Sequence, residues 1–182
     1  STIAGPDANF TVSIANLVSG NYTFSVQAED KRGIRSNLFV FPIFMSEHAS
    51  TNIGGIFLAP TIDVDKSEVK RGDTIEIFGQ SVPQADIIIS INSDEEIFTK
   101  ARSDQDGIYL LNFDTSPLKI GKHGAKSKAA VDNLISPFSS IVGFKVGTAS
   151  IAKELVSSCP SKSDLNGDCR VNLIDFSIAA YW

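Results

Sequence analysis

The sequence predicts a mainly β protein, made of antiparallel β-sandwich units in tandem and followed by a short loop and helix. Short runs rich in β-branched and aromatic residues alternate with Gly, Pro, Asn and Asp turn signals through the first 147 residues, as in antiparallel sheets. A motif around Leu17 returns around Leu118, 101 positions later, and this period is that of one sandwich following another. Residues 164–175 place oxygen-bearing side chains at the spacing of a metal-binding loop.

The composition is that of a globular protein without a bias toward a charged partner. The chain has 182 residues, of which 42% are hydrophobic and 20% charged, and this length suits one or two domains. Its 21 acidic and 16 basic residues give a net charge of −5, which favours neither nucleic acid nor an anionic membrane. No apolar run approaches the roughly 18 residues of a membrane-spanning helix. Because the sequence does not begin with Met, we expect its natural N-terminus to lie upstream.

Residues 1–46 are expected to form three strands, at Phe10–Ile14, Asn21–Ala28 and Asn37–Met45. A turn signal, Asp30-Lys-Arg-Gly33, separates the last two. A full sandwich of this type needs about seven strands. We therefore interpret this range as the C-terminal part of a sandwich whose beginning is absent. The alternative is a small three-stranded sheet that packs on its neighbour.

A second and complete sandwich is expected over residues 56–147. The small and polar residues 47–55 are interpreted as the linker before it, and residues 148–163 as the linker after it, with a short helix over Ala149–Val156. The seven expected strands are Ile56–Val64, Thr74–Gly79, Asp86–Asn92, Ile97–Ser103, Ile108–Phe113, Ala125–Val131 and Ser140–Val146.

Two motifs give this part of the chain a family resemblance. Leu17-x-x-Gly20-x-Tyr22 resembles the tyrosine corner of fibronectin type III and immunoglobulin-like sandwiches, in which the tyrosine hydroxyl binds nearby backbone. Its second copy carries His123 in place of the tyrosine, and Ala129 and the serines Ser136 and Ser139 loosely echo Ala28 and Ser36. Residues 56–147 resemble bacterial Ig-like domains of cell-surface proteins, on the segments Phe78–Asp86, Ser103–Tyr109 and Leu118–His123.

Residues 164–175 have the pattern of a calcium-binding EF-hand loop. Calcium is a hard cation that takes six to eight oxygen ligands, and this loop has oxygen-bearing side chains at positions 1, 3, 5, 9 and 12. We therefore predict bound Ca²⁺. The expected ligands are the side chains of Asp164, Asn166, Asp168 and Asp175, the carbonyl of Arg170, and Asn172 directly or through water.

The same segment resembles the first half of a type I dockerin, the module by which secreted proteins dock to cohesin domains. The matching residues are Asp164, Asn166, Gly167, Asp168, Val171, Asn172 and Asp175, followed by the apolar run Phe176–Trp182. The resemblance implies a cohesin-like domain, or a missing second dockerin half, as the partner. The expected partner-binding residues are Leu173, Ile174, Tyr181 and Trp182. This chain differs from the dockerin pattern in having one loop, and Cys169 where dockerins have Gly.

The two cysteines, Cys159 and Cys169, flank the start of the calcium loop. One interpretation is a disulfide, which closes a short ring and indicates an oxidising compartment. The alternative is a pair of free thiols in a reducing compartment. Both cysteines fall in one local segment, which favours the disulfide.

No constellation of catalytic residues stands out elsewhere. Asp94-Glu-Glu96 is interpreted as a solvated turn, because no His or second acidic cluster accompanies it. Asp104-Gln-Asp-Gly107 is interpreted as the hairpin turn between two strands rather than a second calcium site. The sequence thus predicts a non-catalytic attachment protein, extracellular or at the cell surface. The alternative is a set of accessory C-terminal domains of a secreted polysaccharide-degrading enzyme.

Overall fold

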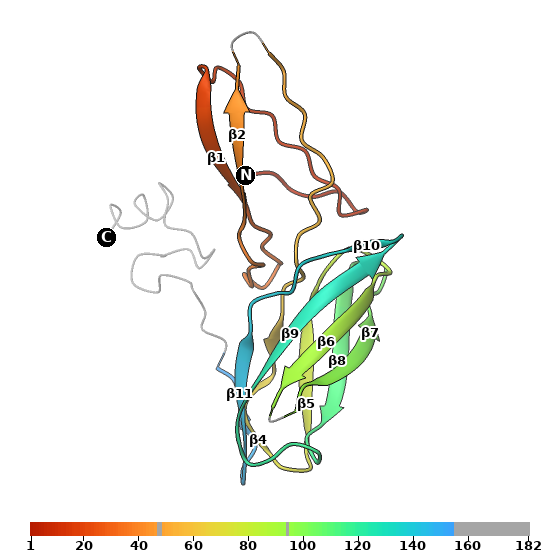
Figure 1. Cartoon of the computed structure of the whole chain (residues 1–182). Coiled ribbons are helices and arrows are strands. Elements are labelled where there is room, and N and C mark those ends of the chain that lie inside the picture. The colour runs from red at the N-terminus through yellow and green to blue at the C-terminus, as the bar shows by residue number, and fades with distance from the viewer. Residues whose placement is uncertain (47–48, 94, 155–182) are drawn as a thin grey trace, which may run out of the picture.

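The computed structural model describes residues 1–46, 49–93 and 95–154 (Figure 1). Every regular element in these ranges is a strand, so the described part of the chain is all β. The strands are β1 (Gly20–Val26), β2 (Phe39–Met45), β3 (Asp63–Val64), β4 (Lys66–Lys70), β5 (Thr74–Gln80), β6 (Asp86–Asn92), β7 (Ile97–Arg102), β8 (Ile108–Asp114), β9 (Gly121–Val131), β10 (Leu134–Ile135), β11 (Val142–Gly147) and β12 (Ile151–Ala152).

Strands β3 to β12 form a sandwich of two sheets, which we call the second unit. One sheet has the order β3-β5-β8, and the other has the order β12-β4-β11-β9-β6-β7 with β10 paired to β9. The chain changes sheet at Asp65, whose backbone N–H and side chain both bind the backbone of Glu76 in β5. As a result β4 lies parallel to β11, while the other pairs are antiparallel. The prediction of purely antiparallel sheets is therefore wrong at this pair.

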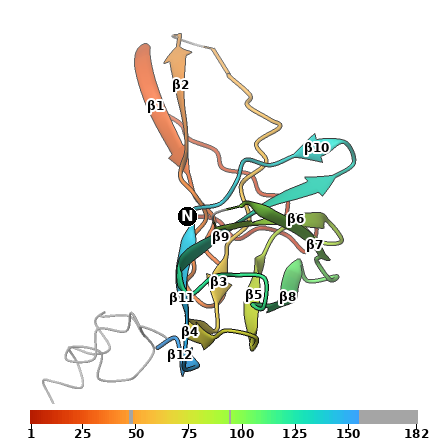
Figure 2. The same ribbon diagram turned by 60° about the horizontal axis from the view of Figure 1, so that its bottom comes forward.

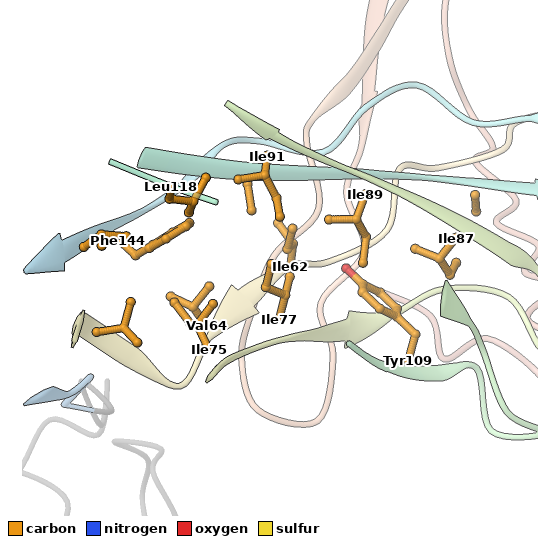
Figure 3. Packing of buried hydrophobic residues seen from close by; sticks show 14 of the residues in the cluster. Ile62, Val64, Ile75, Ile77, Ile87, Ile89, Ile91, Tyr109, Leu118 and Phe144 are labelled. Atoms are coloured by element: carbon orange, nitrogen blue, oxygen red, sulfur yellow. The ribbon is translucent and has the colours of Figure 1, made fainter. Parts of the chain in front are cut away.

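The core of the second unit lies between its two sheets (Figure 3). Ile75 and Ile77 point inward from β5, and Ile87, Ile89 and Ile91 point inward from β6. All five side chains are fully buried. Their spacing of two residues follows from the alternation of side chains along a strand, and their β-branched shape suits a pleated surface.

Strands β1 and β2 form an antiparallel hairpin, which we call the first unit. Its register runs from Gly20 opposite Met45 to Val26 opposite Phe39. Tyr22, Phe24, Phe41 and Phe39 stack along one half-buried face of this hairpin, with neighbouring ring centroids 5.6 to 6.1 Å apart. In Figure 1 the connection between β1 and β2 lies at the end of the hairpin nearest the sandwich.

Three expected elements differ from the structure. Phe10–Ile14 is not a strand, because its alternating residues pair with no other strand among the described residues. The run Ile56–Val64 is strand only at its last two residues. The helix expected to begin at Ala149 is wrong over its described part, where β12 instead adds to the edge of β4 (Figure 2).

Candidate functional site

The predicted calcium loop and its apolar helix lie outside the described residues. This holds for the metal-ligand set Asp164, Asn166, Asp168, Arg170, Asn172 and Asp175, for Cys159 and Cys169, and for Leu173, Ile174, Tyr181 and Trp182. These assignments therefore stay predictions. Within residues 1–46, 49–93 and 95–154, no group of three or more His, Cys, Asp or Glu side chains is placed to hold a metal ion.

The repeated corner motif forms the same hydrogen bond in both units. The Tyr22 hydroxyl donates to the carbonyl of Val18 at 2.9 Å, four residues back. His123 Nε2 lies 2.8 Å from the carbonyl of Lys119, again four residues back. Because a carbonyl only accepts, Nε2 of His123 carries the proton. The histidine therefore closes the second corner as the tyrosine closes the first.

The second shared feature is a serine that binds the backbone of an alanine seven or eight residues earlier in the chain. In the first unit, the Ser36 hydroxyl accepts from the backbone N–H of Ala28, and the Ser36 N–H donates to the Ala28 carbonyl, both at 2.9 Å. Ser136 and Ala129 make the same two bonds at 2.9 Å in the second unit. Both serines are buried, so these bonds satisfy backbone groups that water does not reach. This match confirms the repeat that the sequence indicated.

A buried polar chain crosses the sandwich at Tyr109. Its hydroxyl donates to the Thr61 carbonyl at 2.6 Å and lies 3.0 Å from Ser127 Oγ on the opposite sheet. Burial raises the pKa of the Tyr109 phenol, and the hydrogen bond with Ser127 partly offsets that rise. The hydroxyl therefore stays protonated and acts as a structural cross-link between the two sheets.

Two of the acidic side chains considered in the sequence, Asp104 and Glu96, have structural partners. Asp104 Oδ1 accepts the backbone N–H groups of Asp106 and Ile108 at 2.9 and 2.8 Å, which closes the turn from β7 to β8. Those strands belong to different sheets, so the segment is a connection between sheets and not the expected hairpin turn. The hydrogen bond from the Ser90 hydroxyl, followed by that from Lys126, lowers the pKa of the Glu96 carboxyl.

The two units meet through the loop of residues 27–38, which we call the junction loop. Asp30 Oδ2 accepts from Thr61 Oγ1 at 3.2 Å, and Asn37 Nδ2 donates to the Phe138 carbonyl at 2.9 Å. The guanidinium carbon of Arg32 lies 4.2 Å from the centroid of the Phe78 ring. Sequence reasoning missed this site, because each contact joins residues far apart in the chain and no local pattern marks it.

Of three comparisons with known proteins, only the one with solved structures found similar proteins. No protein-family model matches it, and no curated protein matches it. Among solved structures, it is similar to one described as the crystal structure of a tetra-tandem repeat in the extending region of a large adhesion protein. The identity is 19% and the TM-score 0.36, over 79% of this chain and 34% of that chain. Among the described residues, no helix has the length and apolar character needed to cross a membrane.

Proposed function

We propose that this chain is a non-catalytic attachment part of a modular protein that acts outside the cell or on its surface. In this proposal residues 1–46 are the C-terminal part of one sandwich unit and residues 56–147 a complete one. Residues 47–55 connect the two units, and residues 148–163 connect the second unit to the segment that follows, with β12 added to the edge of the second unit. The sandwich units act as spacers, and residues 164–182 form a calcium-loaded segment that docks to a cohesin-like domain.

The observation that carries the spacer role is the hydrogen-bond set that the two units share. The corner bonds of Tyr22 and His123 and the bridges of Ser36 and Ser136 occupy corresponding places. Repetition of one unit extends a chain by a fixed length without creating a new kind of site. A tandem unit held by the same internal bonds is therefore suited to positioning whatever lies at its ends.

The positions of the polar side chains also support a scaffold. His123 closes a corner, Tyr109 links the two sheets through buried atoms, and Asp104 closes a turn. A catalytic group needs a free atom in reach of a substrate, together with a partner that tunes it. In this structure the same atoms are used to hold backbone in place.

Calcium binding is proposed from the sequence of the loop. The carboxylates of Asp164, Asp168 and Asp175 supply three negative charges, and Asn166 supplies a neutral oxygen. Ca²⁺ bound by these groups brings the two ends of the loop together and sets the start of the helix that follows. The apolar side chains of that helix then form a surface for a partner, because a helix that is apolar on every side must be buried.

We expect Ca²⁺ to change the fluorescence of Trp182, which is the single tryptophan of the chain. Ca²⁺ that orders the loop also changes the surroundings of the helix on which Trp182 lies. The measurement is a titration of the full chain with Ca²⁺ after treatment with a chelator, and it should give a saturable change. Asp164→Ala should abolish that change, because it removes the ligand at loop position 1.

The matched control is Asp106→Ala, which removes an exposed carboxylate from the acidic turn between β7 and β8. This variant should titrate like the unmodified chain. A flat signal in the unmodified chain, or an equal response in the Asp164→Ala variant, would contradict calcium binding by residues 164–175.

A further inference from the structure

We infer that the junction loop is a locking joint, which fixes the orientation of the first unit on the second. This inference rests on the spacer role proposed above, and deepens it by stating how the spacer keeps its shape. The joint consists of Asp30, Arg32 and Asn37 on the first unit. Their partners on the second unit are Thr61, Phe78 and Phe138.

The contacts are spread over three parts of the second unit. Thr61 lies just before β3, Phe78 lies on β5, and Phe138 lies between β10 and β11. A single contact leaves two bodies free to rotate about it, whereas contacts on three separate elements restrict rotation about every axis. The first two partners lie on or beside the β3-β5-β8 sheet, and Phe138 precedes a strand of the other sheet. The junction loop therefore engages both layers of the sandwich.

The Asp30 carboxylate and the Thr61 hydroxyl are each oriented by further hydrogen bonds within their own unit. Asp30 Oδ1 accepts the backbone N–H groups of Arg32 and Ile34, each at 2.9 Å, so the carboxylate is oriented by its own turn. Thr61 is only 3% exposed, and its hydroxyl accepts the Gln80 N–H at 2.9 Å. Its carbonyl accepts from Tyr109, which continues the chain of bonds into the core. Separation at this contact therefore breaks a part-buried hydrogen bond between two groups that are already oriented.

Comparison of the two units distinguishes the contacts of the joint from the hydrogen bonds that both units share. Aligning the two units on their shared hydrogen bonds places Asp30 and Arg32 opposite Val131 and Asn133. Aligning Ser36 on Ser136 places Asn37 opposite Pro137. None of the three joint residues is retained in the second unit, although the corner and the serine bridge are. The contacts of Arg32 and Asn37 are therefore additions to the unit, whereas Asp30 also holds its own turn.

A pocket of about 210 Å³ lies beside one of these contacts, the hydrogen bond from Asn37 to Phe138. It is lined by Asn37, Leu38, Phe39, Val40, Ala59 and Pro137. An interface that leaves such a space gains less from close packing than a filled core does. The two hydrogen bonds and the cation–π contact therefore supply the directional contacts of the junction.

The test measures a distance between the units in the full chain. Nitroxide spin labels are placed on exposed positions by Thr23→Cys on β1 and Lys100→Cys on β7, with Cys159→Ser and Cys169→Ser to keep the labelling unique. Pulsed electron–electron double resonance should give one narrow distance maximum. The double variant Arg32→Ala, Asn37→Ala should lose that maximum and give a broad distribution. Asp30 is left unchanged because it also holds its own turn.

Controls distinguish a loosened joint from a damaged unit. Lys31→Ala, in the same loop, and Asn133→Gly, at the position corresponding to Arg32, should keep the narrow maximum; glycine is chosen because Asn133 has a φ of 66°. Phe78→Leu removes the partner of Arg32 on the second unit and should also broaden the distance distribution. Leucine keeps an apolar side chain at this position but has no aromatic ring for the Arg32 guanidinium. Each variant should retain the thermal transition of the unmodified chain.

A broad distribution in the unmodified chain would overturn the inference, and so would a narrow one in the double variant. Either result leaves the calcium titration of residues 164–175 unaffected, because that measurement does not depend on the junction loop. Conversely, a chain that fails to bind calcium can still give a narrow distribution of distances between the two spin labels. The failure of the joint and the failure of the proposed docking segment are thus separable.

Discussion

Replacing Gly79 by alanine is expected to destabilise the second unit by about 3 kcal/mol, the upper end of the usual cost of overpacking. A Cβ at this position would lie 2.0 Å from the Thr61 carbonyl oxygen and 2.7 Å from the Tyr109 hydroxyl. Neither atom has room to move, because the two are hydrogen-bonded to each other and Thr61 N–H is bonded to Gln80. Relief of the clash requires β5 to separate from the segment before β3.

Urea unfolding followed by circular dichroism measures this effect. The matched control is Gly143→Ala on β11, where the nearest heavy atom to the added carbon is the His123 carbonyl oxygen at 3.9 Å. That spacing is an ordinary van der Waals contact, so the control should change the free energy of unfolding little. Equal stability of the Gly79→Ala variant and the unmodified chain would show that the close approach of these backbones is not required.

Truncation of the central core residue Ile77 to alanine is expected to cost about 2–5 kcal/mol, the range for large-to-small changes at buried sites. The Ile77 side chain is 0% exposed and lies in the layer between the two sheets, where Ile89 and Ile91 face it (Figure 3). Its removal takes apolar surface out of contact and leaves a cavity that rigid strands fill only in part. The free energy of unfolding from denaturant titration gives the loss directly.

Leu110→Ala is the control for this substitution. Leu110 lies on β8, the strand paired with β5, and its side chain is 53% exposed. Its truncation removes a comparable number of carbon atoms without opening a cavity, so it should cost clearly less than the change at Ile77. Similar losses for the two variants would argue against a core centred between the sheets.

Strong local patterns made the centre of the sandwich predictable. The runs that became β5, β6, β7 and β8 are rich in β-branched or aromatic residues and are bounded by turn residues, and their predicted ends agree with the structure to within one residue. Strand β4, with the sequence Lys-Ser-Glu-Val-Lys, was missed because only Val69 is fully buried and the rest is polar. Its parallel pairing with β11 depends on the change of sheet at Asp65, a tertiary event without a local signal.

The repeat was predictable for a different reason. Tyr22 and His123 differ chemically, yet each carries a hydrogen-bond donor that reaches the carbonyl four residues earlier. Both residues stand two positions after a glycine, and this shared spacing identified the two copies of the motif. The serine bridges were visible only loosely, because the sequence offered both Ser136 and Ser139 as counterparts of Ser36. The contacts of the junction loop could not be predicted from the sequence, because they depend on how the two units meet. The calcium loop, in contrast, is a purely local pattern and remains a prediction from sequence.

Capture of the full chain by immobilised cohesin domains, with Ca²⁺ and with an excess of chelator, tests the proposed attachment role most directly. The account predicts retention in Ca²⁺ and release by the chelator. It also predicts that Asp164→Ala is not retained, whereas Asp106→Ala is. Absence of retention from every cohesin in both conditions would contradict the docking role. Retention that the chelator does not reverse would contradict its dependence on calcium.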